Sequence, residues 1–268
     1  MKHNLNIIKI LFFVSLFCLI SISCRSVINI SDENFRNHLY KNGYIDYDNE
    51  NNTYITKKGN ELTMLDCSNL ELKSLKGIEH FKNLEILKCQ NNKLTKLNLN
   101  NNTKLRILEC YQNEIKNINI KGCPELTVII CSDNPLQNVD LRYNTKLQEF
   151  TCISGKLSSI NTSNNKDLRI LVVSQNRIKS VDVSNNKELK QLLVFFNPID
   201  TLDLKENHFL EELYCRGTNV KHLDLTNNPN LNKVFCTDTP LKTLFISKAC
   251  NNARFQMMLP KEVVYEFR

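Results

Sequence analysis

The chain has 268 residues, of which 41% are hydrophobic and 24% are charged, and it carries 35 basic and 28 acidic residues. The basic residues are spread among the acidic ones along the sequence, which argues against a nucleic-acid-binding protein. None of the nucleophile, zinc or phosphate-binding motifs of common enzyme classes is present, and six glycines leave little material for an active-site loop. We therefore expect a protein that is not an enzyme and that needs no metal or other cofactor.

The first 23 residues have the order of a secretory signal. Lys2 and Lys9 precede or flank an apolar run at residues 10–22, which is too short for a transmembrane helix of about 20 residues. The run ends just before Cys24 and resembles the cleavage box of a bacterial lipoprotein, although Ser21 stands where leucine is usual. We predict lipidation of Cys24 and anchoring in the outer membrane at the cell surface. The alternative is an ordinary signal peptide and a periplasmic or secreted protein.

Residues 24–61 are predicted to form the anchor segment and an N-terminal cap. Within them we expect a short helix whose N-cap is Ser31. Acidic residues alternate between Asp46 and Asn52, as they do in calcium loops. An EF-hand would need glycine and glutamate where this chain has Asn51 and Lys57. The sequence therefore predicts a solvated turn there, with cation binding as the alternative.

From Leu84 onward the sequence repeats every 21 residues through eight units without an insertion. With Leu84 as position 1, unit positions 1, 4, 6, 11, 14 and 16 are apolar at 47 of 48 sites, and only Thr162 departs. A fixed period of this length predicts a solenoid, because one unit buries its apolar side only by stacking on its neighbours. We expect this solenoid to occupy residues 62–246 as one domain.

Each unit has two similar halves, and each half has a short segment of alternating apolar residues, such as residues 87–89 and 97–99. This alternation predicts two parallel strand ladders, of which the front one is the firmer. No segment on the back is long enough for a full helix, so coils should stack at the strand spacing of about 4.8 Å. We predict a mainly-β, right-handed coil with an extended back side, in the shape of a nearly straight, twisted rod.

Two inward columns of special side chains follow from the repeat. Five units have asparagine at position 9, where an amide can bond the backbone of adjoining coils, and Gly155, Thr218 and Thr239 interrupt this column. Position 6 holds a column of cysteines, namely Cys67, Cys89, Cys110, Cys131, Cys152, Cys215 and Cys236. Val173 and Val194 take the same position in two units, which indicates a small buried apolar site. We expect free thiols, because neighbouring side chains point in the wrong direction for a disulfide. Disulfides and a metal site are the alternatives.

Side chains at positions 3, 5, 7 and 8 are predicted to face outward from the front ladder. The candidate binding residues are Val172, Leu193, Phe195, Phe196, Tyr214, Arg216 and Phe235. Exposed apolar side chains with an arginine are typical of protein-binding hot spots. One alternative is that a C-terminal cap at residues 247–268, with a closing strand at 259–267, covers them. Another is plain β-propensity on a sheet surface.

The unit resembles a known family. Residues 199–207 (IDTLDLKEN) and 220–228 (VKHLDLTNN) are similar to the 21-residue class of bacterial leucine-rich repeats. Residues 62–83 resemble the first repeat of internalin-like proteins, and residues 28–43 resemble the helical cap of surface proteins from Bacteroidetes-type bacteria. The resemblance implies a leucine-rich-repeat lipoprotein that binds a macromolecule.

We expect a monomer whose front face binds a protein, which would be a host protein or a protein of the cell envelope. Binding of a glycan or an envelope polymer, or a role as a periplasm-facing scaffold, is the alternative. Tyr214 and Glu212 would suit a sugar, but the chain has no tryptophan, which favours a protein partner.

Overall fold

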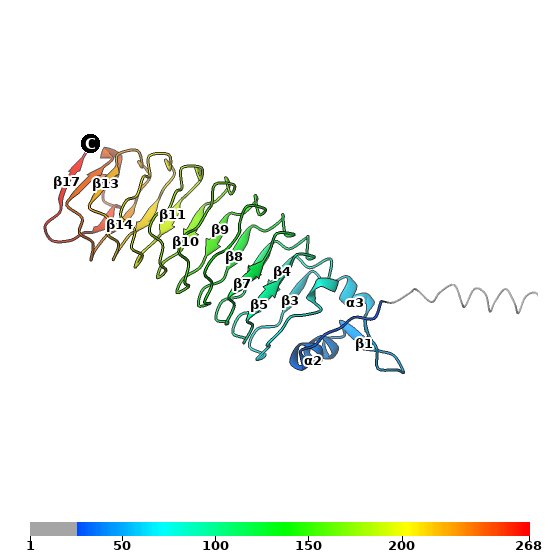
Figure 1. Cartoon of the computed structure of the whole chain (residues 1–268). Coiled ribbons are helices and arrows are strands. Elements are labelled where there is room, and N and C mark those ends of the chain that lie inside the picture. Colours follow the sequence, from blue (N-terminus) through cyan, green and yellow to red (C-terminus); the bar gives the residue numbers. More distant parts are fainter. Residues whose placement is uncertain (1–25) are drawn as a thin grey trace, which may run out of the picture.

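The computed structural model describes residues 26–268, so the predicted signal peptide and the predicted lipidation site at Cys24 lie outside the described residues. A small N-terminal cap is followed by an elongated stack of coils that runs to the C-terminus (Figure 1). One ten-stranded sheet extends along the stack, and its neighbouring strands are parallel. The predicted mainly-β solenoid is therefore confirmed.

Every coil contributes one three-residue strand to this front sheet. The strands are β3 (Met64–Asp66), β4 (Ile86–Lys88), β6 (Ile107–Glu109), β8 (Val128–Ile130), β9 (Glu149–Thr151), β10 (Ile170–Val172), β11 (Gln191–Leu193), β12 (Glu212–Tyr214), β14 (Lys233–Phe235) and β16 (Gln256–Met258). From β4 to β14 each residue pairs with the residue 21 positions further along, as Leu171 does with Leu192. This constant register turns each unit position into a column that follows the long axis.

The apolar unit positions point inward and form one continuous core. Leu84, Leu87, Cys89, Leu94 and Leu99 are all fully buried in the first regular coil. The same positions are buried in the following coils, so each coil covers the apolar side of the next one.

The back of the solenoid is less regular than the front. Strand pairing on the back joins β5 (Lys96–Asn98) to β7 (Asn117–Asn119) near one end. At the other end β13 (His222–Leu225), β15 (Thr243–Ile246) and β17 (Val264–Phe267) form a parallel sheet. Between these two groups the described residues form turns and irregular segments on the back, so the predicted second ladder exists only near the ends.

The N-terminal cap begins with helix α2 (Glu33–Lys41), which buries Phe35 and Leu39. Its N-cap is Asp32 and not Ser31, so that prediction was wrong. One Asp32 carboxylate oxygen accepts a hydrogen bond from the backbone N–H of Phe35 at 3.0 Å. The other oxygen accepts from the backbone N–H of Lys73 at 2.7 Å. Asp32 is preferred because a carboxylate has two oxygens, with which it caps the helix and holds the first repeat at the same time.

A hairpin completes the cap, with β1 (Ile45–Tyr47) antiparallel to β2 (Thr53–Ile55), and α3 (Lys57–Asn60) follows it. The Asp46–Asn52 segment comprises the end of β1 and the hairpin turn. The Asp48 carboxylate accepts hydrogen bonds from the Asn52 side chain, the Tyr54 hydroxyl and two backbone N–H groups, and these bonds lower its pKa to about 2. Asp48 is thus engaged by donors of the turn itself. Within residues 26–268 no group of three or more metal-ligating side chains comes together.

The predicted asparagine ladder is confirmed. The Asn134 side-chain amide donates to the Cys110 carbonyl of the preceding coil at 2.9 Å and to the Cys131 carbonyl of its own coil at 3.2 Å. Its oxygen accepts from the backbone N–H of Ile115 in the preceding coil at 2.8 Å. One side chain therefore ties two turns together.

A second amide column lies at unit position 19 on the back. Asn144 there donates to the Ile120 and Cys123 carbonyls of the preceding coil at 3.0 and 2.8 Å. Thr162, at unit position 16, is the one polar residue among the 48 predicted apolar sites. It is linked to this column because its hydroxyl donates to the Asn186 side-chain oxygen at 2.7 Å. The equivalent oxygens of Asn102, Asn144, Asn165, Asn207 and Asn228 are buried without a protein partner.

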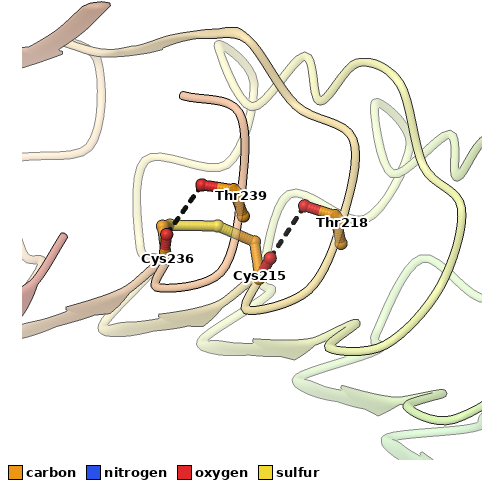
Figure 2. Close-up of a disulfide and its surroundings, with 4 residues drawn as sticks. All are labelled: Cys215, Thr218, Cys236 and Thr239. Atoms are coloured by element: carbon orange, nitrogen blue, oxygen red, sulfur yellow. Dashed lines mark hydrogen bonds between the residues drawn. A yellow bond between two sulfur atoms is a disulfide. The ribbon is translucent and has the colours of Figure 1, made fainter. Parts of the chain in front are cut away.

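The cysteine column contains one departure from the prediction. Cys67, Cys89, Cys110, Cys131 and Cys152 are free and fully buried, as expected. Cys215 and Cys236, however, form a disulfide across adjacent coils with their Cα atoms 4.8 Å apart (Figure 2). The expectation of free thiols was wrong for this pair, because rotation about the Cα–Cβ bonds brings the two sulfur atoms together along the column.

The C-terminal tail adds a further coil. A 3-10 turn at Lys248–Cys250 leads to β16, which joins the front sheet, and then to β17, which joins the back sheet. The prediction of one closing strand at residues 259–267 missed β16 and placed the beginning of β17 too early. The tail continues the stack and therefore caps its end without crossing the front face (Figure 1).

Candidate functional site: the C-terminal half of the front face

Four of the predicted binding residues form a single outward column. Val172, Leu193, Tyr214 and Phe235 are direct register partners on successive strands. The Tyr214 and Phe235 rings meet edge to face, with centroids 4.9 Å apart. Val172 is only 8% exposed. The prediction that Val172 offers contact area was therefore wrong, because neighbouring side chains cover it although it stands outside the inward core.

A second group surrounds Phe196. Phe195 and Phe196 are also edge to face, at 5.8 Å, and Phe196 is 45% exposed. The Arg216 guanidinium carbon lies 5.3 Å from the centre of the Phe196 ring, and its Nε donates to Asp238 at 2.7 Å. A guanidinium at this distance from an aromatic ring is attracted to it, so Arg216 and Asp238 help to hold the ring.

Gly217 makes room for Phe196. A Cβ atom on Gly217 would lie 2.4 Å from a Phe196 ring carbon, which is closer than two carbon atoms can approach. Non-glycine residues occur at the same unit position with similar positive φ values, among them Phe196 itself at 54°. Gly217 therefore leaves space for the Phe196 ring. The positive backbone angle alone does not require glycine at this position.

The structure extends the predicted site by one residue. Met258 on β16 is the register partner of Phe235 and is 58% exposed. The step from Phe235 to Met258 is 23 residues, which hides Met258 from a search with the 21-residue period. Leu193, Phe195, Phe196, Tyr214, Phe235 and Met258 are called the front-face apolar cluster below.

Charged pairs occupy other parts of the face. Glu212 accepts from Lys233 at 2.7 Å beside the cluster, and this bond raises the pKa of the Lys233 ammonium. In the N-terminal half Lys88 pairs with Glu109 at 3.1 Å. Single apolar side chains such as Ile107 and Ile130 also face outward in the N-terminal half, but the aromatic rings that contact one another lie at the C-terminal end. The exposure of Phe196 shows that the tail does not bury the cluster, and Met258 of the tail extends it. The alternative in which the tail buries the patch is therefore wrong.

Comparison with known proteins agrees with this architecture. No family model matches the sequence, and no curated protein is similar to it. Among solved structures, the functional domain of InlJ from Listeria monocytogenes is similar, with 26% identity, a TM-score of 0.61 and 79% of this chain covered. The match spans 56% of that InlJ chain, which is described as including a cysteine ladder.

A second solved structure supports the fold alone. Internalin C2 from Listeria monocytogenes is 18% identical with a TM-score of 0.57, and the match covers 85% of this chain and 93% of that one. The parallel front sheet of stacked coils is consistent with both comparisons, and the column of buried cysteines is consistent with the cysteine ladder named for the InlJ domain. The chain therefore folds as a leucine-rich-repeat solenoid that is similar to these two internalin structures.

Proposed function

We propose that this chain is a binding protein and that its front-face apolar cluster contacts a protein partner. The observation that carries the proposal is the gathering of six apolar side chains on one end of an outward sheet face. Soluble proteins rarely leave such groups uncovered unless they bind something. The internalin-like fold supports the same conclusion.

The geometry of the cluster suits a hot spot. The aromatic rings are held by edge-to-face contacts and by Arg216, so little side-chain freedom is lost on binding. Aromatic and arginine side chains dominate the energetics of protein interfaces. The Glu212–Lys233 pair at the margin offers polar groups for the rim of an interface.

We further propose that lipidation of Cys24 holds the protein at the outer membrane, facing host or envelope proteins. This proposal rests on the signal-like residues 1–23 and the serine before Cys24. It is tested by metabolic labelling with a fatty acid in the wild type and in Cys24→Ala. Labelling of both proteins, or of neither, contradicts the anchor.

The binding proposal is tested with two matched triple variants of the same face. Leu193→Ser, Phe195→Ser and Tyr214→Ser together remove the centre of the cluster. The control variant changes Ile107, Tyr111 and Ile130, three partly buried front-face residues outside the cluster, to serine. Each protein is used to capture partners from the surface fraction of host cells and from the envelope fraction of the producing cell.

We expect the cluster variant to lose at least about 30-fold in affinity for the captured partner, since hot-spot truncations cost about 2 kcal/mol or more. The control should stay within about threefold. Equal losses in the two variants, at unchanged circular dichroism, would exclude the cluster as the site.

A glycine pair tests the role of Phe196 without altering any contact residue. Gly217→Ala should displace the Phe196 ring and weaken capture. Gly43→Ala has the same positive backbone angle, with φ of 70° against 67°, but nothing lies within 4 Å of the new methyl group. Capture that Gly217→Ala leaves intact would show that Phe196 does not contribute.

A further inference from the structure

The basic residues, although spread along the sequence, gather on one side of the folded solenoid. Unit positions 10, 12 and 13 follow the turn after the front strand, and over eight units they make 24 sites, called the basic flank below. Eight of these sites are lysine or arginine and two are acidic, Glu114 and Asp200. The cations are Lys93, Lys96, Lys116, Lys156, Arg177, Lys179, Lys221 and Lys242.

This concentration was not expected from the sequence. The basic flank has an excess of six positive charges, whereas residues 24–268 as a whole have an excess of five once Lys2 and Lys9 are removed. The remainder of the protein is therefore close to neutral. Basic residues that are spread along the sequence gather on the folded surface because stacking brings residues of successive units into neighbouring positions.

Most cations of the flank are also unpaired. Among residues 26–268 only Lys93 of the eight has a carboxylate partner, Glu71 at 3.2 Å. The opposite flank, before the front strand, has a pair in several coils, such as Lys146 with Glu125 at 2.6 Å and Lys190 with Glu211 at 2.8 Å. The opposite flank therefore has several internally paired charges, whereas most cations of the basic flank keep an unpaired positive charge.

The chemistry of the flank distinguishes it from the front-face apolar cluster. Its remaining sites are serine, threonine, asparagine, glutamine, histidine and proline, and none is aromatic or a large aliphatic residue. A surface without an apolar anchor lacks the hot spots of a protein interface. Hydroxyl, amide and ammonium groups are instead suited to a hydrated anionic chain.

The dimensions of the flank favour a repeating polymer. Coils follow one another at the strand spacing of about 4.8 Å, so cations of adjacent coils lie close together along the axis. Six of the eight coils carry one or two of these cations, and the coils with Gln137 and Asp200 carry none. At its N-terminal end the flank opens into a hollow of about 710 Å³, whose lining includes Lys76, Lys96 and the amides of Asn98, Asn117 and Asn119, together with one carboxylate, Glu79. Cations and amide donors together suit an acidic sugar.

We propose that the basic flank binds an acidic polysaccharide that lies along the solenoid. The front-face apolar cluster is a separate surface, so this inference does not depend on the proposed protein partner. Lys156, Arg177 and Lys179 lie on adjacent coils, are exposed and have no ion-pair partner among the described residues, which makes them the centre of the site.

The test measures the affinity of the protein with its signal removed, at 50 to 300 mM salt. The probes are heparin, polygalacturonate, neutral dextran and poly-L-glutamate. The flank variant is Lys156→Gln, Arg177→Gln and Lys179→Gln. Its control, with the same loss of charge, is Lys104→Gln, Lys166→Gln and Arg169→Gln on the opposite flank, where all three side chains are exposed.

The wild type should bind heparin or polygalacturonate and should not bind dextran. The flank variant should bind at least tenfold more weakly, and its salt dependence should fall by about two to three units, because about one counterion is released per neutralised charge. The control and the Leu193→Ser, Phe195→Ser, Tyr214→Ser variant should bind like the wild type. If the two charge variants weaken binding equally, the polysaccharide is attracted by the net charge of the protein and not by the basic flank, and the proposed site is wrong. Binding of poly-L-glutamate alone would replace the polysaccharide with an acidic protein.

Discussion

The earlier coils and the last two regular coils of the solenoid join their neighbours by different means. Asn134 in the third regular coil donates to one carbonyl of the preceding coil and to two of its own. Thr218 and Thr239 take the same unit position near the C-terminus, and each hydroxyl donates only to its own coil, to Cys215 and Cys236 at 2.7 Å (Figure 2). Threonine satisfies the turn but is too short to reach the neighbouring coil.

The disulfide lies where the amide link is missing. Cys215 and Cys236 directly follow β12 and β14, the strands that present Tyr214 and Phe235. A covalent bond thus replaces the cross-coil hydrogen bonds beneath the front-face apolar cluster. Where Thr239 replaces the ladder asparagine, the cysteine column supplies a covalent link between the coils, whereas Gly155 interrupts the same ladder beside the free thiols of Cys131 and Cys152.

The largest effect is expected from removing a ladder amide. Asn134→Ala leaves the Ile115 N–H and the Cys110 carbonyl without this partner in the interior, and each such loss costs about 1–3 kcal/mol. We expect a loss of about 4 kcal/mol in the free energy of unfolding, measured by urea denaturation. Thr218→Ala should cost about 1 kcal/mol, since one hydroxyl bond within a coil is removed. Similar losses in both would refute the contrast between the two regions.

The disulfide should come next. Cys215→Ala with Cys236→Ala is expected to lower stability by about 3 kcal/mol relative to the control Cys131→Ala with Cys152→Ala, which removes two sulfurs from the same column but no covalent link. Hydrogen exchange should accelerate around residues 210–258 and not around residues 84–150, since each coil contacts only its neighbours. Non-reducing peptide mapping that finds Cys215 and Cys236 as thiols would contradict the assignment.

Thr162 offers a smaller test in the earlier coils. Thr162→Val removes the donor to the Asn186 side-chain oxygen and should cost about 1 kcal/mol. Val183 has the same unit position as Thr162, and Asn207 in the next coil corresponds to Asn186. The Asn207 side-chain oxygen is buried without a protein partner. Val183→Thr should therefore be neutral or stabilising, whereas the control Val173→Thr in the cysteine column should destabilise by about 1–2 kcal/mol. Equal destabilisation by both threonines would show that the Asn207 oxygen is already satisfied.

The smallest effect is expected from lowering the pH, which should destabilise the N-terminal cap more than either set of coils. The pKa of Asp48 is about 2 in the folded cap, below its unfolded value of about 3.9, so the stabilisation is complete above pH 4–5 and is lost as the pH falls through about 2. Carbon NMR titration of the Asp48 carboxyl should show this midpoint. The cap hairpin should loosen in acid before the coils, whose ladder amides and disulfide do not titrate there. A midpoint near 4 would contradict the hydrogen-bonded turn.

Much of the fold was predictable because a strict period repeats the same information. The core positions and the asparagine ladder follow from the 21-residue spacing alone. The outward direction of Leu193, Tyr214 and Phe235 follows from alternation along a strand. The burial of Val172 could not be predicted from this alternation, since it depends on the sizes of the neighbouring side chains. Met258 was missed because the tail reaches the front sheet after a step of 23 residues.

The sequence by itself determined the repeat, the inward and outward columns and the absence of room for helices on the back, because these depend only on spacing and polarity. Tertiary structure decided which side chains became partners across coils. The Cys215–Cys236 bond joins residues 21 positions apart, and the Thr162–Asn186 hydrogen bond joins residues 24 positions apart. The gathering of cations on one flank likewise brings together residues of neighbouring coils. Such contacts exist only once the coils are stacked, and side-chain rotation and neighbouring bulk then select which of them form.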